Sequence, residues 1–238
     1  MKVAILTNKS SHHLYFLQKL SLDKRINFFF IFEKDSVKFP FKTKHSLDFL
    51  RNKYEKQILK KKNIHYSSFK KIEVKNVNSK KCISLMKKIN PKLIITYGVG
   101  KIKEKFLNHF QKKIFNLHGA DPENYRGLDS FLWAIYHKDF NNFYITLHEL
   151  NHKLDTGNII YKKKVTLNKK SNIYNLRLSS ADTSLNVTKK LISQYLLSKK
   201  KISHPQNLKK GKYYSAMPSV LKDICIKNFK NYIKKKYG

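Results

Sequence analysis

An amide, an imidazole and a carboxylate stand in the middle of the chain at a spacing that suits acyl transfer. Asn116 and His118 lie two residues apart at the end of an apolar run, and Asp155 follows in a turn that Gly157 closes. If residues 114–117 form a strand, Asn116 and His118 point to the same face. His118 could then move a proton, Asn116 could donate to a developing oxyanion, and Asp155 could orient and stabilise the charged imidazole. The trio predicts direct attack of a substrate amine on a carbonyl carbon.

The segments that carry this trio alternate between strand and helix patterns. Short apolar runs predict strands at residues 3–6, 28–32, 72–74, 93–96 and 114–117, and capped or periodic segments predict helices at residues 11–20, 45–62, 78–89 and 103–108. A helix at 129–137, a strand pair at 145–150 and 159–165, and helices at 173–197 and from 219 follow. This alternation predicts an α/β fold with a Rossmann-like, doubly wound, mostly parallel sheet. Ligands of such sheets bind beyond the carboxyl ends of the strands, where residues 96–100 and 116–118 are expected to lie.

The stretch from residue 91 to residue 160 carries five short motifs in a fixed order. They are Asn116-Leu117-His118, Tyr125-Arg126-Gly127, Trp133-Ala134-Ile135, Thr146-Leu147-His148 and Leu154-Asp155-Thr156-Gly157. Each is common on its own, but together they resemble the formyltransferases that use 10-formyltetrahydrofolate. That family includes methionyl-tRNA formyltransferase, glycinamide ribonucleotide formyltransferase and the sugar-nucleotide N-formyltransferases. The resemblance implies the formyltransferase fold, with a catalytic domain at residues 1–180 and a short helical appendix at residues 181–238.

The resemblance also implies a role for particular residues. Asn116, His118 and Asp155 would be catalytic, and Tyr125 and Arg126 would meet the acceptor substrate. The pterin of 10-formyltetrahydrofolate, the formyl donor, would bind two loops through Tyr97, Gly98, Val99, Gly100, Ile102, Leu150 and Leu154. Glycines suit the first of these loops because they allow a close approach of the backbone to a ring. No metal is implied.

The acceptor implied by the resemblance depends on positions at which the chain departs from two branches of the family. Residues 119–124 differ from the loop of methionyl-tRNA formyltransferases, Lys162 stands where many relatives have Gln, and an end at Gly238 leaves no room for the tRNA-gripping β-barrel. The loop at residues 7–11 lacks the glycines that hold a ribonucleotide phosphate in the purine enzyme. We therefore expect a nucleotide-linked amino sugar as acceptor. A methionyl-tRNA or glycinamide ribonucleotide type enzyme, and a non-catalytic polyanion-binding protein, stay as alternatives.

The formal net charge of +36 is also typical of proteins that bind nucleic acids. However, only four of the 51 basic residues are Arg, the residue that reads bases best, and the Lys are spread along the whole chain. Their clusters are residues 60–62, 162–164, 199–201 and 234–236. Together with abundant Asn and Ile, this pattern is typical of an AT-rich genome. We expect no specific nucleic-acid partner, although the charge would attract anionic small-molecule substrates.

The remaining features concern location and supporting residues. No apolar run approaches the roughly 20 residues of a membrane span, and the amino terminus lacks a signal-peptide cleavage pattern, so a cytoplasmic protein is expected. Cys82 and Cys225 lie far apart in helical patterns, which predicts buried free thiols. His12 and His13, at a predicted helix start, are expected to be an exposed pair. A homodimer is one of the assemblies that the sequence allows.

Overall fold

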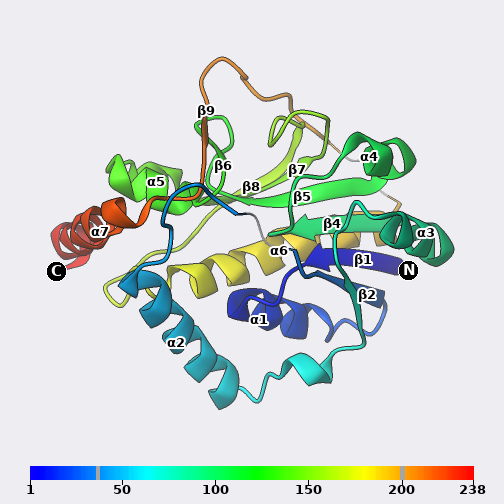
Figure 1. Cartoon of the computed structure of the whole chain (residues 1–238), viewed down its shortest axis with the longest axis horizontal. Helices are drawn as coiled ribbons and strands as arrows, with labels where there is room; N and C mark the ends of the chain where they lie inside the picture. Colours follow the sequence, from blue (N-terminus) through cyan, green and yellow to red (C-terminus); the bar gives the residue numbers. More distant parts are fainter. Residues whose placement is uncertain (36–37, 199–201) are drawn as a thin grey trace.

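A seven-stranded sheet forms the centre of the molecule, in the order β3-β2-β1-β4-β5-β7-β8 (Figure 1). The computed structural model describes residues 1–35, 38–198 and 202–238, so the lysine cluster at residues 199–201 lies outside the described part. The strands are β1 (Lys2–Thr7), β2 (Asn27–Glu33), β3 (Lys71–Val74), β4 (Leu93–Tyr97), β5 (Ile114–Gly119), β7 (Tyr144–Glu149) and β8 (Ile159–Lys164). Strands β3, β2, β1, β4 and β5 pair in parallel in that order. Strand β7 pairs antiparallel with β5, and β8 pairs antiparallel with β7. The predicted α/β fold with a mostly parallel, doubly wound sheet is confirmed.

Helices cover both faces of this sheet (Figure 1). They are α1 (Ser11–Leu20), α2 (Ser46–Lys61), α3 (Lys80–Ile89), α4 (Glu104–Phe110), α5 (Ser130–Tyr136), α6 (Leu176–Leu196) and α7 (Lys222–Tyr237). In β1, Ile5 belongs to the apolar cluster that contains Leu17 of α1, and Leu6 belongs to the cluster that contains Met86 of α3. Neighbouring residues of a strand point to opposite faces, so both faces of the sheet are buried and the apolar runs are continuous.

The local signals in the sequence explain where α3 begins and ends. The Ser79 hydroxyl accepts a hydrogen bond from the Cys82 N–H at 3.2 Å, as an N-cap residue does. Asn90 adopts a left-handed conformation at the carboxyl end, and Pro91 follows it. The predicted helix is therefore confirmed within two residues at its start, and β4 begins directly afterwards at the centre of the sheet.

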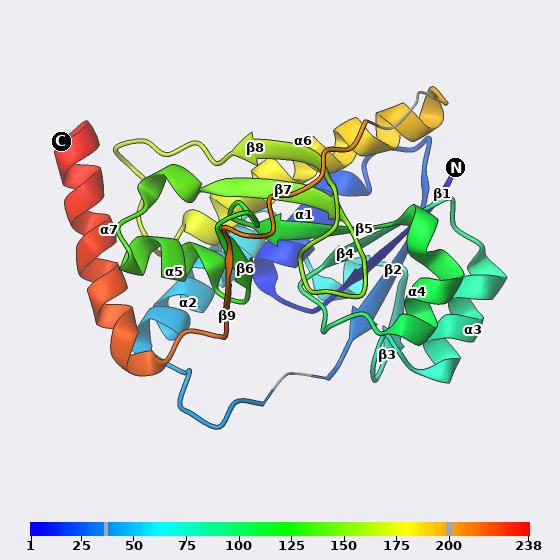
Figure 2. The ribbon, with the colours of Figure 1, turned by 90° about the horizontal axis from the view of Figure 1, so that it is seen from above.

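The carboxyl-terminal part packs back onto residues 125–136. β9 (Lys212–Tyr214) pairs in parallel with β6 (Tyr125–Gly127), a short two-stranded sheet that the sequence did not reveal. Figure 2 shows α7 at one end of the molecule, with α3 and α4 at the other. The Asn228 amide on α7 donates to the carbonyl oxygens of Ile135 and Tyr136 at the end of α5. The predicted division after residue 180 falls inside α6, which packs along α1, and this division stays a prediction.

Two further expectations concern the thiols and the membrane. Cys82 and Cys225 are free and buried, which confirms the prediction made from their surroundings. Burial raises the pKa of the Cys82 thiol to about 11 and that of Cys225 to about 12, so both stay protonated near neutral pH. Within residues 1–35, 38–198 and 202–238, no helix has both the length and the apolar character to cross a membrane.

Candidate active site

The predicted trio comes together at the carboxyl end of β5. Asn116 and His118 leave the same face of β5, and Asp155 reaches them from the loop between β7 and β8. The Asn116 Nδ2 atom lies 3.3 Å from Asp155 Oδ1, and His118 Nδ1 lies 3.6 Å from Asp155 Oδ2. His118 is 5% exposed and Asp155 is 4% exposed. The amide, imidazole and carboxylate therefore meet in a largely dry site, where electrostatic interactions are strong.

The Asn116 side chain is held in one orientation by its neighbours. The Thr96 hydroxyl donates to Asn116 Oδ1 at 2.7 Å, which leaves the Nδ2 hydrogens pointing toward Asp155 and His148. The His148 Nδ1–H donates to the carbonyl oxygen of Glu149 at 2.7 Å, so its Nε2 is free to accept from Asn116 Nδ2 at 3.2 Å. His148, fully buried on β7, thus supports the site, as the sequence indicated.

The hydrogen bonds of His118 define which nitrogen can accept a proton. Its Nε2 lies 2.7 Å from the carbonyl oxygen of Tyr125, and because a carbonyl can only accept, Nε2 carries the hydrogen. In the neutral ring Nδ1 is then the basic atom, and it faces Asp155 Oδ2. Burial lowers the pKa of His118, and this effect outweighs the opposite influence of Asp155. His118 therefore rests neutral, and a proton taken up at Nδ1 would form an ion pair with Asp155.

The Asp155 carboxylate is fixed on several sides. Its Oδ2 accepts the Gly127 N–H at 2.8 Å. Burial alone would raise the pKa of Asp155, but its interactions with the imidazoles of His118 and His148 and the hydrogen bond from the Gly127 N–H hold this pKa below its ordinary value. The turn needs Gly157, because a Cβ there would lie 1.8 Å from the carbonyl oxygen of Glu149. Asp155 is thus an ionised group whose position depends on both sheets.

The first loop predicted to bind the pterin follows β4. Gly98 has a φ of +70°, and a Cβ at this position would lie 2.3 Å from the His13 ring. The Gly100 N–H donates to Glu33 Oε2 at 2.7 Å, which ties the loop to the end of β2. Val99 is partly buried against the apolar cluster on the α3 side, and Ile102 belongs to that cluster. The loop is therefore a rigid backbone turn with an apolar base.

The second predicted loop supplies one buried and one exposed leucine. Leu150 belongs to the same apolar cluster as Ile102, whereas Leu154 is 36% exposed. The Tyr97 side chain, by contrast, turns into the core on the other side of the sheet, where its ring lies 5.3 Å from that of Phe16. Burial raises the pKa of Tyr97 to about 12. Any contact of Tyr97 with a ligand would have to be made by its backbone.

The expectation of an exposed histidine pair at the start of α1 is wrong. The His13 side chain is buried, its ring lies 3.9 Å from the Tyr97 ring in a tilted arrangement, and its Nδ1 is hydrogen-bonded to the Thr7 hydroxyl. The His12 side chain is 12% exposed, with Nδ1 3.5 Å from Glu55 Oε2. Burial lowers the pKa of both imidazoles well below the ordinary value. The helix start was predicted correctly, but its packing under β4 could not be read from local sequence.

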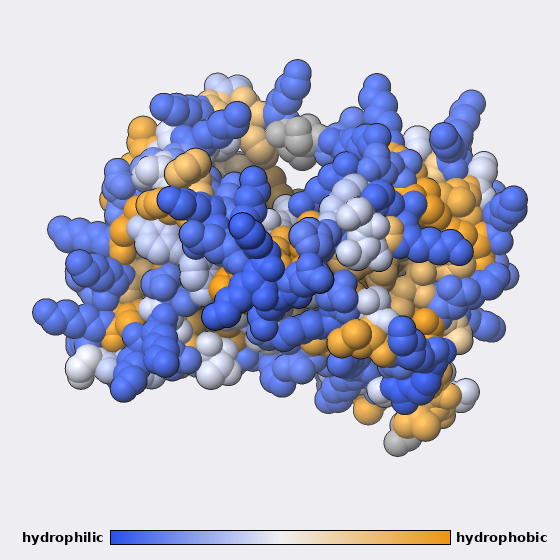
Figure 3. Space-filling model, turned by 90° about the horizontal axis from the view of Figure 1, so that it is seen from below, coloured by the Kyte–Doolittle hydropathy of each residue, from blue (hydrophilic) through white to orange (hydrophobic). Residues whose placement is uncertain are grey.

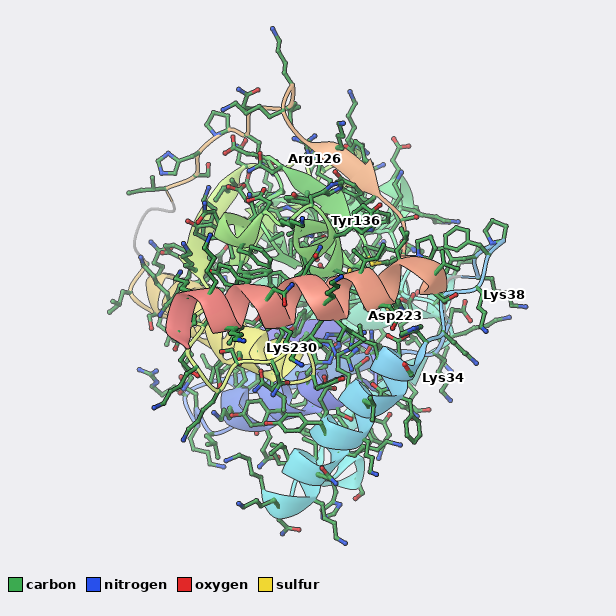
Figure 4. The ribbon with its side chains drawn as sticks, turned by 90° about the vertical axis from the view of Figure 1, so that its left-hand side faces the viewer. Lys34, Lys38, Arg126, Tyr136, Asp223 and Lys230 are labelled. Atoms are coloured by element: carbon green, nitrogen blue, oxygen red, sulfur yellow. The ribbon has the colours of Figure 1, made fainter. Side chains whose placement is uncertain are left out.

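Tyr125 and Arg126, predicted to meet the acceptor, are both buried. The Tyr125 hydroxyl donates to Asp139 Oδ2 at 3.2 Å, and its backbone carbonyl holds His118. The Arg126 side chain is 2% exposed and donates to the carbonyl oxygen of Gly211 at 3.1 Å, beside β9 (Figure 4). The Arg126 side chain therefore helps to hold the segment that carries β9 in place. A role of these two residues in acceptor binding stays a prediction.

Three residues that support the site were not singled out from the sequence. Thr96 orients Asn116, and a signal for it existed, because the parallel pairing of β4 and β5 places these two residues side by side. The Gln206 amide donates to the carbonyl oxygens of Asp155 and Gly157 at 3.0 and 2.6 Å, from a segment about 50 residues away in sequence for which no local signal existed. Ser130, whose hydroxyl lies 3.4 Å from His118 Nε2, stood in the predicted cap of α5.

The family assignment follows from a comparison with known proteins. A family model described as Formyl transferase matches residues 50–191, which is more than half of the chain. The chain belongs to the formyl transferase family. The matched stretch contains Asn116, His118 and Asp155. The resemblance drawn from the motifs is confirmed at this level.

Individual relatives show how far the similarity extends. Over 171 residues the chain is 28% identical to the bifunctional polymyxin resistance protein ArnA of Wigglesworthia glossinidia brevipalpis, covering 68% of this chain and 22% of that protein. It is 28% identical over 118 residues to methionyl-tRNA formyltransferase of Finegoldia magna, covering 49% and 37%. The matches thus span well under half of either relative's length. A sugar N-formyltransferase structure from Shewanella sp. superposes with a TM-score of 0.60 at 15% identity, covering 96% of this chain and 87% of that one, which shows a shared fold.

Proposed function

We propose that the protein transfers the formyl group of 10-formyltetrahydrofolate to the amino group of a nucleotide-linked amino sugar. The observation that carries this proposal is the convergence of Asn116 with the buried His118 and Asp155 at the carboxyl end of β5 in a member of the formyl transferase family. The family membership supplies the reaction class, and the trio supplies the groups that the reaction needs.

The geometry suggests a role for each group in this reaction. As the acceptor nitrogen bonds to the formyl carbon, negative charge develops on the formyl oxygen. The contacts of Asn116 Nδ2 at 3.2 and 3.3 Å are long for hydrogen bonds, so an oxyanion that lies closer to Nδ2 would compete with them for its hydrogens. His118 would take the amine proton at Nδ1, and Asp155 would stabilise the resulting imidazolium. The same proton would pass to the nitrogen of tetrahydrofolate as its bond to the formyl carbon breaks.

The donor and the acceptor would approach from different sides. The glycine turn at Gly98 and Gly100, with Ile102 and Leu150 beneath it, suits a flat ring that contacts backbone groups and an apolar floor. For the acceptor, the departures at residues 119–124 and 7–11 weigh against tRNA and a ribonucleotide. The net charge of +36 favours an anionic substrate such as a nucleotide-sugar. Synthesis of such sugars for surface polysaccharides, in the cytoplasm, is the setting that this proposal implies.

A thermal-shift screen tests the proposal. The full chain is heated with nucleotide-linked amino sugars, with glycinamide ribonucleotide and with methionyl-tRNA, each with and without a stable folate analogue. A ligand that binds only the folded state stabilises it by RT ln(1 + L/Kd), where L is the ligand concentration, and so raises the melting temperature. We expect the folate analogue and at least one amino-sugar nucleotide to raise it. A shift with methionyl-tRNA or glycinamide ribonucleotide alone would refute the sugar acceptor.

A further inference from the structure

We propose that an open groove between the start of α2 and the start of α7 holds the nucleotide part of the acceptor. This inference rests on the proposed function and extends it by naming the nucleotide subsite. The groove has a volume of about 590 Å³. Its lining includes Lys42, Lys44, Phe49, Ser219, Val220 and Asp223. We call it the α2–α7 groove.

The apolar lining of the α2–α7 groove is unusually exposed. Phe49 is 69% exposed and Val220 is 79% exposed, although large apolar side chains usually find partners in the core. They come from segments about 170 residues apart and line one groove. An aromatic ring beside an aliphatic side chain offers a stacking surface to a nucleobase, because every base has a flat π-face. Ser219 and Asp223 add hydrogen-bonding groups for the edge of the base.

The charges around the groove suit a diphosphate. The acidic side chain in the lining, Asp223, has a carboxylate oxygen 3.4 Å from His45 Nε2, and Asp48, which is not part of the lining, forms an ion pair with Lys222 at 2.7 Å. Lys42 and Lys44 are exposed, and neither forms an ion pair with the described part of the chain. Two unpaired ammonium groups beside an aromatic ring match a compact ligand that combines a base with phosphates. A volume of about 590 Å³ lies within the range of roughly 300–1,000 Å³ that is usual for small-molecule sites.

The groove is connected to the catalytic residues by a short chain of contacts. The Ser219 N–H donates to the carbonyl oxygen of Lys42 at 2.9 Å, which joins the two walls. Two residues earlier, the Met217 N–H donates to Asp129 Oδ2 at 2.9 Å, and the next residue, Ser130, contacts His118. Figure 3 shows one face of the molecule, on which hydrophilic side chains predominate and hydrophobic ones form smaller patches between them. A nucleotide in the groove would therefore lie on the side of the molecule from which its sugar can approach the end of β5.

Calorimetric titration with UDP, dTDP and GDP tests the groove in the full chain. We expect at least one of the three to bind, and we expect Phe49→Ala and the pair Lys42→Ala/Lys44→Ala each to weaken its Kd at least tenfold. The matched control is Lys60→Ala/Lys61→Ala, which removes two exposed lysines at the other end of α2 and should leave Kd unchanged. Because all these side chains are exposed, melting temperatures should stay the same. Equal losses in the control pair would mean that only net charge attracts the nucleotide, and the proposal would be wrong.

Kinetics separate this inference from the proposed function. If an amino-sugar nucleotide is formylated, Phe49→Ala should raise its KM about tenfold and leave kcat unchanged. Formylation with an unaltered KM would overturn the groove and keep the function. Binding of UDP or dTDP that depends on Phe49, without formylation of any amino sugar, would keep the groove and overturn the function. Absence of binding by all three diphosphates, or preference of the groove for an oligonucleotide or a second copy of the chain, would overturn the inference.

Discussion

Thr96→Val tests whether the orientation of Asn116 matters for the reaction. Thr96 is 1% exposed, and its hydroxyl is the donor to Asn116 Oδ1 at 2.7 Å. Valine has nearly the same shape, so the main change is the loss of that donor. A buried acceptor left without a partner costs about 1–3 kcal/mol. We expect a loss of about that size in the free energy of unfolding.

The same substitution should slow the reaction. Without the Thr96 donor the amide can rotate by half a turn and present its oxygen, instead of its hydrogens, to the developing oxyanion. If the loss of this orientation raises the activation free energy by about 1.4 kcal/mol, kcat falls about tenfold, while KM changes little.

Two measurements on Thr96→Val and Thr96→Ser, steady-state formyl transfer and urea unfolding, test the role of Thr96. They distinguish a role in orienting Asn116 from a role in packing alone. Serine keeps the hydroxyl and removes only a methyl group, so its kcat should stay near that of the wild type although its stability falls. A wild-type kcat in the valine variant, or an equal fall of kcat in both variants, would refute the reasoning.

Three further predictions follow from the same geometry. His118→Asn should lower kcat by roughly 10²–10⁴, the usual contribution of a general base, in a chain that still unfolds cooperatively, and a rate near wild type would remove His118 from the mechanism. Asp155→Asn should lower kcat much more than it raises KM, since the carboxylate acts mainly on the charged imidazole; an effect on KM alone would indicate a binding role instead. Burial lowers the pKa of His13 and His118, so below about pH 6.5 the unfolded chain binds more protons than the folded chain. The free energy of unfolding should therefore fall as the pH is lowered, by up to about 1.4 kcal/mol per pH unit for each histidine. Urea unfolding at pH 7.5 and pH 5.5 measures this effect, and equal stabilities would contradict it.

The sheet and the shared face of Asn116 and His118 were predictable because each depended on local sequence, whereas Asp155 was placed beside them by the resemblance of the motifs to the family. Buried strands read as continuous apolar runs, and Asn116 and His118 share a face by the two-residue period of β5 alone. Ser79 and Pro91 bounded α3 by chemistry that acts within a few residues. These signals do not depend on how distant segments pack, so the folded chain agrees with the predictions made from them.

The features that the sequence did not reveal depend on contacts between distant segments. The burial of Arg126 is one of them, because the segment at residues 207–211 covers its side chain. His12 and His13 read as an exposed pair, yet the β4 loop and α2 bury them. β6 and β9 have three residues each and pair across more than 80 positions, so neither strand has a periodicity that sequence reasoning can detect.

The central claim is that His118 and its partners transfer a formyl group to an amino sugar carried on a nucleotide. Its most direct test is mass spectrometry of a panel of nucleotide-linked amino sugars after incubation with the full chain and 10-formyltetrahydrofolate. We predict that one acceptor gains the mass of a single formyl group, that the gain requires the folate, and that His118→Asn abolishes it. If no amino sugar gains mass while initiator methionyl-tRNA or glycinamide ribonucleotide does, or if His118→Asn forms product at the wild-type rate, the claim is contradicted.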